Sequence, residues 1–248
     1  MYKVWAFGDS DTAGHELGSK KINFRNFLKA RNFNTAYEAQ KSLSDKQYED
    51  FVSQWLKQID NIQTPELSYA GQVASLLGRN LISNAVTGAS VDEQILRLSQ
   101  TEDKIDWKND LVIFGVPRPY RWMTHTGECV QASRVLRKSK TQKLWMEVGM
   151  SNIALNIYYA SAHTYIKQRW PQVLLIRMHS VLIDPAINLK KMQDCFFSKV
   201  SLAEFANDNY GQDCTYPGGH FREFVHESYA SLLLDMLTKD KKYSKIIK

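Results

Sequence analysis

The sequence predicts an α/β protein built around a parallel β-sheet. Short apolar runs alternate with helical patterns along the chain, and most of these runs end in turns rich in glycine. The run at residues 110–115 is apolar throughout its middle, which is typical of a parallel strand that helices cover on both faces. Such strands are joined by right-handed crossovers. We find no internal repeat and no linker, so we expect a single domain over residues 1–248.

Each predicted strand is a short apolar run that stops at a turn signal. The first run begins at Lys3 and ends in the turn-forming residues Gly8, Asp9 and Ser10. In chain order the predicted strands are residues 3–8, 81–86, 110–115 and 173–178.

The helices are predicted from apolar residues spaced three and four positions apart. The clearest one begins after Thr64 with Pro65 at its first position, and it stops at Gly78. Residues 15–64 are richer in Lys, Asn, Asp and Gln and are predicted to form an inserted helical segment. The other predicted helices begin at about residue 91 and cover about residues 142–168 and 221–237, after which the chain is expected to fray into a solvated basic tail at residues 239–248.

The composition excludes several classes of protein. Of 248 residues, 44% are hydrophobic and 23% are charged, which is enough apolar material for a large core. The formal net charge of +6 falls short of a dedicated nucleic-acid surface, so nucleic acid is not expected as a partner. No apolar stretch reaches the roughly 20 residues of a membrane span, and no signal-peptide core is present. We therefore expect a soluble, cytoplasmic protein.

Neither disulfides nor a metal site are expected. The three cysteines are widely spaced and contain no CxxC pair, which fits free thiols in a reducing compartment. No cofactor motif stands out, so no cofactor is expected. Four histidines show no metal-ligand spacing: His15, His125, His163 and His179.

The candidate reactive residues follow the predicted strands, at the sheet edge where ligands bind in folds of this class. Ser10 lies in the turn after the first strand, Gly88 follows the second, and His220 comes late in the chain after two glycines. A serine in a tight turn, near backbone N–H groups and a histidine, is what nucleophilic acyl transfer requires. The alternative interpretation is a plain turn at Ser10 and ordinary helix N-termini at Gly88 and His220.

Several segments resemble the SGNH (GDSL) hydrolase family, in that family's order. Phe7-Gly8-Asp9-Ser10-Asp11-Thr12-Ala13-Gly14 is similar to the first block, GDSxTxG. Residues 67–78 resemble the helix that follows it, and residues 84–90 resemble the second block, with Gly88 at the family's glycine. Gly219-His220-Phe221 is similar to the last block, which carries the catalytic histidine.

This resemblance implies a three-layer α/β/α fold, flavodoxin-like, with helical insertions, and it implies ester hydrolysis. Ser10 would be the nucleophile and His220 the general base. The backbone N–H groups of Ser10 and Gly88 would form the oxyanion hole.

The chain departs from the family at the third block, which in the family ends in Gly-x-Asn and supplies a third oxyanion donor. Here Pro117 stands in place of that asparagine, and proline has no N–H to donate. Some phage-encoded members have a Ser/Thr-Pro-x-Arg pattern instead, which residues 119–122 resemble, so Arg121 is a candidate substitute donor and the chain resembles a divergent phage-type member.

A second departure concerns the acid of the triad. The family's aspartate stands three residues before the histidine, where this chain has Pro217. Asp213 is the nearest upstream carboxylate and is our choice for the acid. Asp184 and a Ser–His dyad oriented by a backbone carbonyl are the alternatives.

The leading hypothesis is therefore an SGNH-type serine hydrolase that cleaves an acyl or acetyl ester on a small molecule or a carbohydrate. One alternative is a catalytically degenerate fold that acts as a binding or structural module, for example in a phage particle, which would place the protein in a virion. Another is a polyanion-binding protein that uses the basic residues 134–143 and the lysine tail. No oligomeric state is predicted.

Overall fold

The computed structural model describes residues 2–18, 22–59, 63–117, 121–123, 129–131, 152–178 and 196–247. Its centre is a parallel sheet with the strand order β2-β1-β3-β6. This is the order of a flavodoxin-like sheet, in which the chain first pairs β1 with β2 and then crosses back to add strands on the other side. The predicted α/β class is confirmed. The strands are β1 (Lys3–Phe7), β2 (Asn80–Ser83), β3 (Leu111–Val116) and β6 (Leu174–Arg177).

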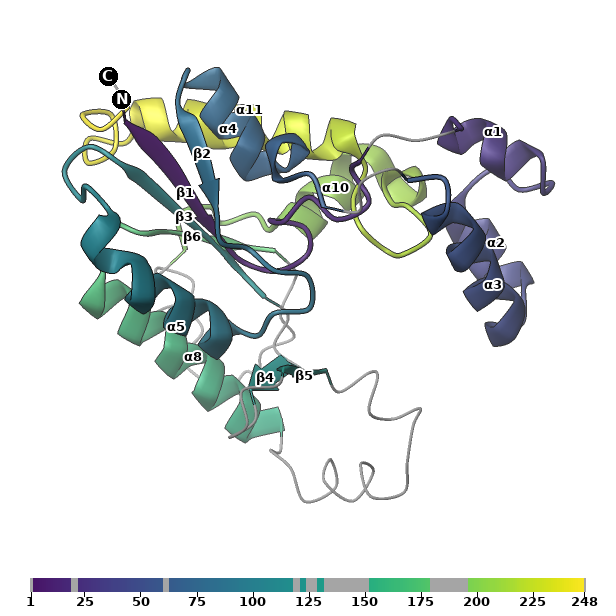
Figure 1. Ribbon diagram of the computed structural model, residues 1–248, viewed down its shortest axis with the longest axis horizontal. Helices are drawn as coiled ribbons and strands as arrows, with labels where there is room; N and C mark the ends of the chain where they lie inside the picture. Colours follow the sequence, from purple (N-terminus) through teal and green to yellow (C-terminus); the bar gives the residue numbers. More distant parts are fainter. Residues whose placement is uncertain are drawn as a thin grey trace.

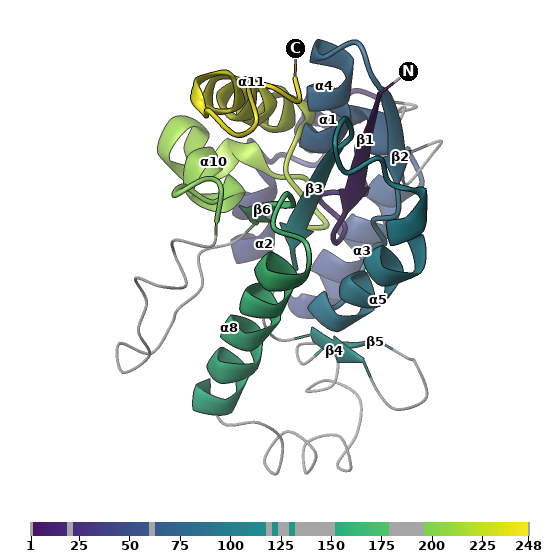
Figure 2. The same cartoon turned by 90° about the vertical axis from the view of Figure 1, so that its left-hand side faces the viewer.

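Helices cover both faces of this sheet (Figures 1 and 2). Alternate residues of β1 point to opposite faces, so that Val4 and Ala6 contact one helical layer while Trp5 and Phe7 contact the other. The first layer holds α4 (Tyr69–Leu76), α10 (Leu202–Tyr210) and α11 (Glu223–Lys239). The second layer holds α5 (Val91–Thr101) and α8 (Asn152–Arg169).

The inserted segment supplies most of a third apolar cluster, which Tyr216 joins from a distant part of the chain, and its helices lie beyond the carboxyl end of β1 at the right of Figure 1. We call this cluster the insertion core. Its helices are α1 (Phe24–Lys29), α2 (Ala36–Ser42) and α3 (Asp45–Leu56). The buried members of the insertion core are Leu17, Phe24, Phe27, Leu28, Ala36, Ala39, Phe51, Trp55, Ile59 and Tyr216.

Two predicted helices differ in their bounds. The helix expected directly after Thr64 is a 3₁₀ turn, Pro65–Leu67, followed by α4, because the Ser68 side chain accepts a hydrogen bond from Gly71 N at 3.2 Å and starts a new helix. The helix expected from about residue 142 begins at Asn152 in the described part of the chain. Residues 142–151 lie outside it.

The end of the chain was predicted to fray, and this is wrong for residues 240–247. Tyr243 is only 4% exposed, and its ring lies 5.3 Å from that of Phe197. Ile246 and Ile247 pack against the same cluster, so the apolar residues of the tail hold it against the core. The lysines at 239, 241, 242 and 245 are exposed, as expected of a solvated basic surface.

Two further elements complete the described chain. A short antiparallel hairpin joins β4 (Arg121–Met123) and β5 (Cys129–Gln131). Within the described ranges, no helix has both the length and the apolar character needed to cross a membrane.

Candidate active site

Ser10 lies in a tight turn at the carboxyl end of β1, and it is 3% exposed. The Ser10 carbonyl accepts a hydrogen bond from His15 N at 2.8 Å, which fixes the turn. Two glycines make room for Thr12 beside it. A Cβ atom at Gly8 would lie 2.4 Å from Thr12 Oγ1, and one at Gly115 would lie 2.2 Å from it. Both glycines therefore let β1 and β3 approach this threonine closely, and the turn that carries Ser10 is built into the sheet.

Gly88 lies beside the same end of β1. The chain after β2 continues the sheet pairing, since Asn84 N donates to Ala6 O at 2.8 Å and Val86 N donates to Gly8 O at 3.0 Å. Gly88 has φ of +84°, a conformation that favours glycine, and a Cβ atom there would meet nothing within 4 Å. Ser90 then caps α5. Backbone N–H groups at the start of a helix favour an anion, as an oxyanion hole requires.

His220 lies on a tight turn just before α11. Tyr216 N donates to His220 O at 2.8 Å, and Gly219 N donates to Tyr216 O at 2.9 Å. Thr215 and Phe221 then pair as an isolated antiparallel bridge. These contacts fix the backbone of His220 at the base of a closed turn.

The His220 side chain is bound to a carboxylate that the sequence did not single out. His220 Nδ1 lies 2.6 Å from Oε2 of Glu16, whose side chain is fully buried, while the imidazole is 17% exposed. Glu16 Oε1 also accepts a hydrogen bond from Gly218 N at 3.2 Å. With the carboxylate as acceptor, Nδ1 carries the proton, and Nε2 is left to accept one.

Glu16 holds an unusual backbone conformation. Its φ is +64°, in the left-handed region that residues other than glycine and asparagine rarely adopt. Such a conformation costs roughly 1 kcal/mol or more and persists where the surroundings hold it, which is common at functional sites. Asn32 is the other described residue, glycines apart, with a positive φ, at +61°, and asparagine tolerates this conformation better than glutamate does.

The turns that carry Ser10 and His220 contact each other. The rings of His15 and His220 meet edge to face with their centroids 4.4 Å apart. Phe221 N donates to Asp11 Oδ1 at 3.4 Å, which joins the residue after His220 to the residue after Ser10. The predicted nucleophile and the predicted base therefore lie on adjacent turns at one edge of the sheet.

The surroundings of His220 favour its charged form. Burial lowers the pKa of this histidine, but the hydrogen bond to Glu16 and the charges of Asp11, Glu16 and Asp9 outweigh it and raise the pKa above its usual value of 6.5. Asp9 and Asp11 are themselves buried. The negative charges around His220 thus hold a proton on the imidazole up to a higher pH than in water.

Asp213 does not occupy the position on His220 that the sequence analysis gave it. Asp213, our choice from the sequence, is 49% exposed and pairs with Arg222 Nη1 at 3.2 Å. Asp184 lies outside the described residues. No residue near His220 signals Glu16 in the sequence, because the two lie 204 positions apart. The one hint in the sequence is that Pro217 stands where the resemblance places an aspartate, so an acid would have to come from elsewhere in the chain.

The third oxyanion donor is not found at Pro117. That residue is buried after β3, and its carbonyl accepts a hydrogen bond from the Tyr159 hydroxyl. Arg121 opens β4 opposite Gln131, and its side chain lies outside what the structure describes. Its role as a donor stays a prediction.

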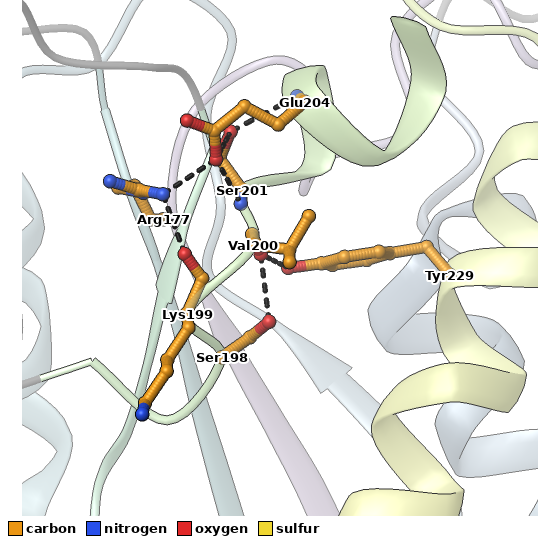
Figure 3. Close-up of polar contacts among 7 residues, drawn as sticks. All are labelled: Arg177, Ser198, Lys199, Val200, Ser201, Glu204 and Tyr229. Carbon is orange, nitrogen blue, oxygen red and sulfur yellow. Dashed lines mark hydrogen bonds and ion pairs between the residues drawn. The ribbon is translucent and has the colours of Figure 1, made fainter. Parts of the chain in front are cut away.

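A second cation, Arg177, lies at the end of β6 and is engaged elsewhere (Figure 3). Its Nη2 donates to Glu204 Oε2 at 2.5 Å and to the Lys199 carbonyl at 2.6 Å. Tyr229 donates to the neighbouring carbonyl of Val200 at 3.0 Å. This network fastens residues 198–201 to α10 and α11, so Arg177 serves the fold.

The remaining histidines that the structure describes are buried and structural. His226 accepts a hydrogen bond from Tyr69 N at 3.1 Å, and burial lowers its pKa to about 4. The ring of His163 packs edge to face on Tyr159 and Phe196, and burial lowers its pKa to about 3. Among the described residues, no group of three His, Cys, Asp or Glu side chains is placed to hold a metal ion.

Comparison with known proteins gives a likeness in fold. No protein-family model matches the chain, and no curated protein does. Solved structures that it resembles include a lipase/acylhydrolase from Enterococcus faecalis, at 14% identity and a TM-score of 0.45, covering 96% of each chain. A putative GDSL-like lipase from Parabacteroides merdae gives 10% identity and a TM-score of 0.42, covering 95% of this chain and 94% of that chain.

Carbohydrate esterases are also among these structures. An acetyl xylan esterase from Butyrivibrio proteoclasticus gives 13% identity and a TM-score of 0.44, covering 96% of this chain and 63% of that chain. Another carbohydrate esterase gives 14% identity and a TM-score of 0.46, and the present chain spans 65% of its length. We assign the site from its own geometry, because similarity of this degree does not identify the residues that act.

Proposed function

We propose that the protein is a serine hydrolase that cleaves an ester, with Ser10 as nucleophile, His220 as general base and Glu16 as the carboxylate that orients the base. The observation that carries this proposal is the 2.6 Å contact between His220 Nδ1 and the buried Glu16 carboxylate. A triad is recognised by such geometry and not by the order of its residues along the chain. The contacts between the turns of Ser10 and His220 support the same assignment.

The reaction has two balanced halves. Ser10 Oγ attacks the ester carbonyl as its proton moves to His220 Nε2, and the carbonyl electron pair moves onto the oxygen, which faces the N–H groups of Ser10 and Gly88. Collapse of this intermediate breaks the bond to the alcohol, which leaves with the proton from Nε2. Water then attacks the acyl-serine in the same way, releasing the acid and restoring Ser10. Glu16 holds the proton on Nδ1 throughout and stabilises the imidazolium.

The proposed substrate is an acyl or acetyl ester of modest size, carried by a small molecule or a carbohydrate. The test is hydrolysis of p-nitrophenyl acetate and butyrate by the wild type and by Ser10→Ala. We expect turnover in the wild type and none above background in the variant, with a melting temperature close to that of the wild type because the substitution removes one small hydroxyl. Equal rates in the two proteins would exclude Ser10 as the nucleophile.

One observation favours a second function, a binding module without turnover. Pro117 removes the third oxyanion donor, and its carbonyl is occupied by Tyr159. A folded wild type that hydrolyses neither ester, but that is stabilised by an acetylated carbohydrate, would support this alternative. A carbohydrate-independent melting temperature together with turnover would support the hydrolase.

A further inference from the structure

The turn that carries His220 is attached to the inserted helices through Tyr216. Tyr216 N donates to His220 O at 2.8 Å, so the two residues face each other across the turn. The Tyr216 ring is 4% exposed and belongs to the insertion core. Its centroid lies 5.3 Å from that of Trp55 and 5.1 Å from that of Phe24. The backbone of His220 is therefore fixed against side chains from α1 and α3.

Tyr48 of α3 provides a second attachment to the same turn. Its hydroxyl donates to the Pro217 carbonyl at 2.7 Å, and its ring stacks on Phe51 with 5.8 Å between centroids. The next residue, Gly218, donates its N–H to Glu16 Oε1 at 3.2 Å. The turn is thus held from one side by α3 and from the other by the carboxylate that bonds His220.

The turn passes directly over that carboxylate. A Cβ atom at Gly218 would lie 2.3 Å from Glu16 Oε2, the oxygen that contacts His220 Nδ1. A small movement of the turn would therefore change the distance between Glu16 and His220. An orienting acid 204 positions away in the chain works only if both partners are held in place.

We propose that the inserted segment positions the general base, with Tyr48 and Tyr216 as positioning residues that hold His220 against Glu16. The catalytic consequence rests on the proposed function. The physical consequence, the geometry of the Glu16–His220 pair, does not. The inserted segment would then serve the site in two ways. Glu16 takes the place of the missing local aspartate, and α3 holds the turn that carries His220.

The test compares Tyr48→Phe with a matched control, Tyr37→Phe. Tyr48→Phe keeps the ring and removes only the hydroxyl that holds Pro217. Tyr37 lies on the neighbouring helix α2 and is 37% exposed, and its hydroxyl makes no hydrogen bond to any described residue of the turn. For Tyr48→Phe we expect kcat on p-nitrophenyl acetate to fall about five- to tenfold with KM unchanged, as loss of one orienting hydrogen bond would cause. Tyr37→Phe should keep the wild-type kcat.

The second readout is the titration of His220 followed by NMR, which needs no activity. The charged groups that face this histidine are Glu16, Asp11 and Asp9, with the His15 ring against it and the buried His226 of α11 close enough to interact with its charge. The hydrogen bond to Glu16 raises the pKa of His220, while burial lowers it. If Tyr48→Phe loosens that bond, the pKa of His220 should fall in this variant and not in Tyr37→Phe.

The outcomes separate the two claims. If Tyr48→Phe matches Tyr37→Phe in both kcat and the titration of His220, the positioning role is overturned. If the wild type hydrolyses no ester but the titration of His220 still falls in Tyr48→Phe alone, the positioning role stands and the proposed function fails.

Discussion

Glu16 and His220 lie 204 positions apart in the chain, yet Glu16 Oε2 is 2.6 Å from His220 Nδ1. The carboxylate is fully buried and also holds Gly218 N, so it fixes both the imidazole and the turn that carries it. Because a carboxylate on Nδ1 sets the tautomer, this pair leaves Nε2 free to accept a proton, which in the proposed reaction comes from Ser10.

The first prediction separates the two candidate acids. Glu16→Gln should lower kcat/KM by about 10²- to 10⁴-fold, because an amide can donate to Nδ1 and favour the wrong tautomer. Asp213→Asn, the matched control, should change kcat/KM by less than about threefold, since Asp213 pairs with Arg222 and does not contact His220. The measurement is ester hydrolysis under saturating and dilute substrate. A large loss in Asp213→Asn with Glu16→Gln unaffected would return the role to Asp213.

The second prediction concerns pH. The pKa of His220 is raised above 6.5, so this imidazole loses its proton and can act as a base only at a higher pH than a free histidine does. We therefore expect kcat/KM to rise with pH through an apparent pKa above 6.5. In Glu16→Gln, the residual activity should show this rise at lower pH. Burial lowers the pKa of His220, and the variant lacks the Glu16 charge that raises it. A profile of kcat/KM from pH 5 to 9 measures both. An unchanged midpoint in the variant would show that Glu16 does not set the titration.

The third prediction concerns stability in acid. His226 and His163 have pKa values lowered to about 4 and about 3, so the unfolded chain takes up protons below pH 6.5 that the folded chain does not. Each histidine should therefore reduce the free energy of unfolding by about 1.4 kcal/mol per pH unit as the pH falls from 6.5 toward its folded value. His220, with a raised pKa, acts in the opposite sense, and its contribution is lost as the pH rises.

His226→Gln isolates one of these contributions, because an amide oxygen can still accept from Tyr69 N. Urea unfolding at pH 6.5, 5.5 and 4.5 should give a shallower loss of stability in the variant than in the wild type. Parallel losses in the two proteins would mean that His226 does not stay neutral in the fold.

The sheet could be predicted from the sequence because its signal is local. Residues 110–115 are apolar on both faces, and β3 is buried throughout and covered by helices on each side. Ser10, Gly88 and His220 could be proposed in the same way, since each lies in or beside a short motif of small residues. The placement of Ser10 and Gly88 at one edge follows from the parallel order of the strands, whereas His220 reaches that edge on the turn before α11.

The contact between Glu16 and His220 could not be predicted, because it depends on tertiary structure. Glu16 begins a segment whose composition marks it only as helical, and its contact with His220 exists once the insertion core has placed Tyr216. The docked tail shows a related limit. Its lysines predicted a solvent-exposed tail, but Tyr243, Ile246 and Ile247 pack against the core and hold it there. The helix α10 was missed because its apolar face is short.

The most direct test of the central claim is labelling with a fluorophosphonate, followed by mass spectrometry of the digested protein. We expect one adduct, on Ser10, in the wild type, and a labelling rate at least about tenfold lower in Glu16→Gln, because the serine is activated through His220. A folded wild type that carries no adduct on Ser10, or that is labelled at the same rate when Glu16 is replaced, would contradict the triad of Ser10, His220 and Glu16.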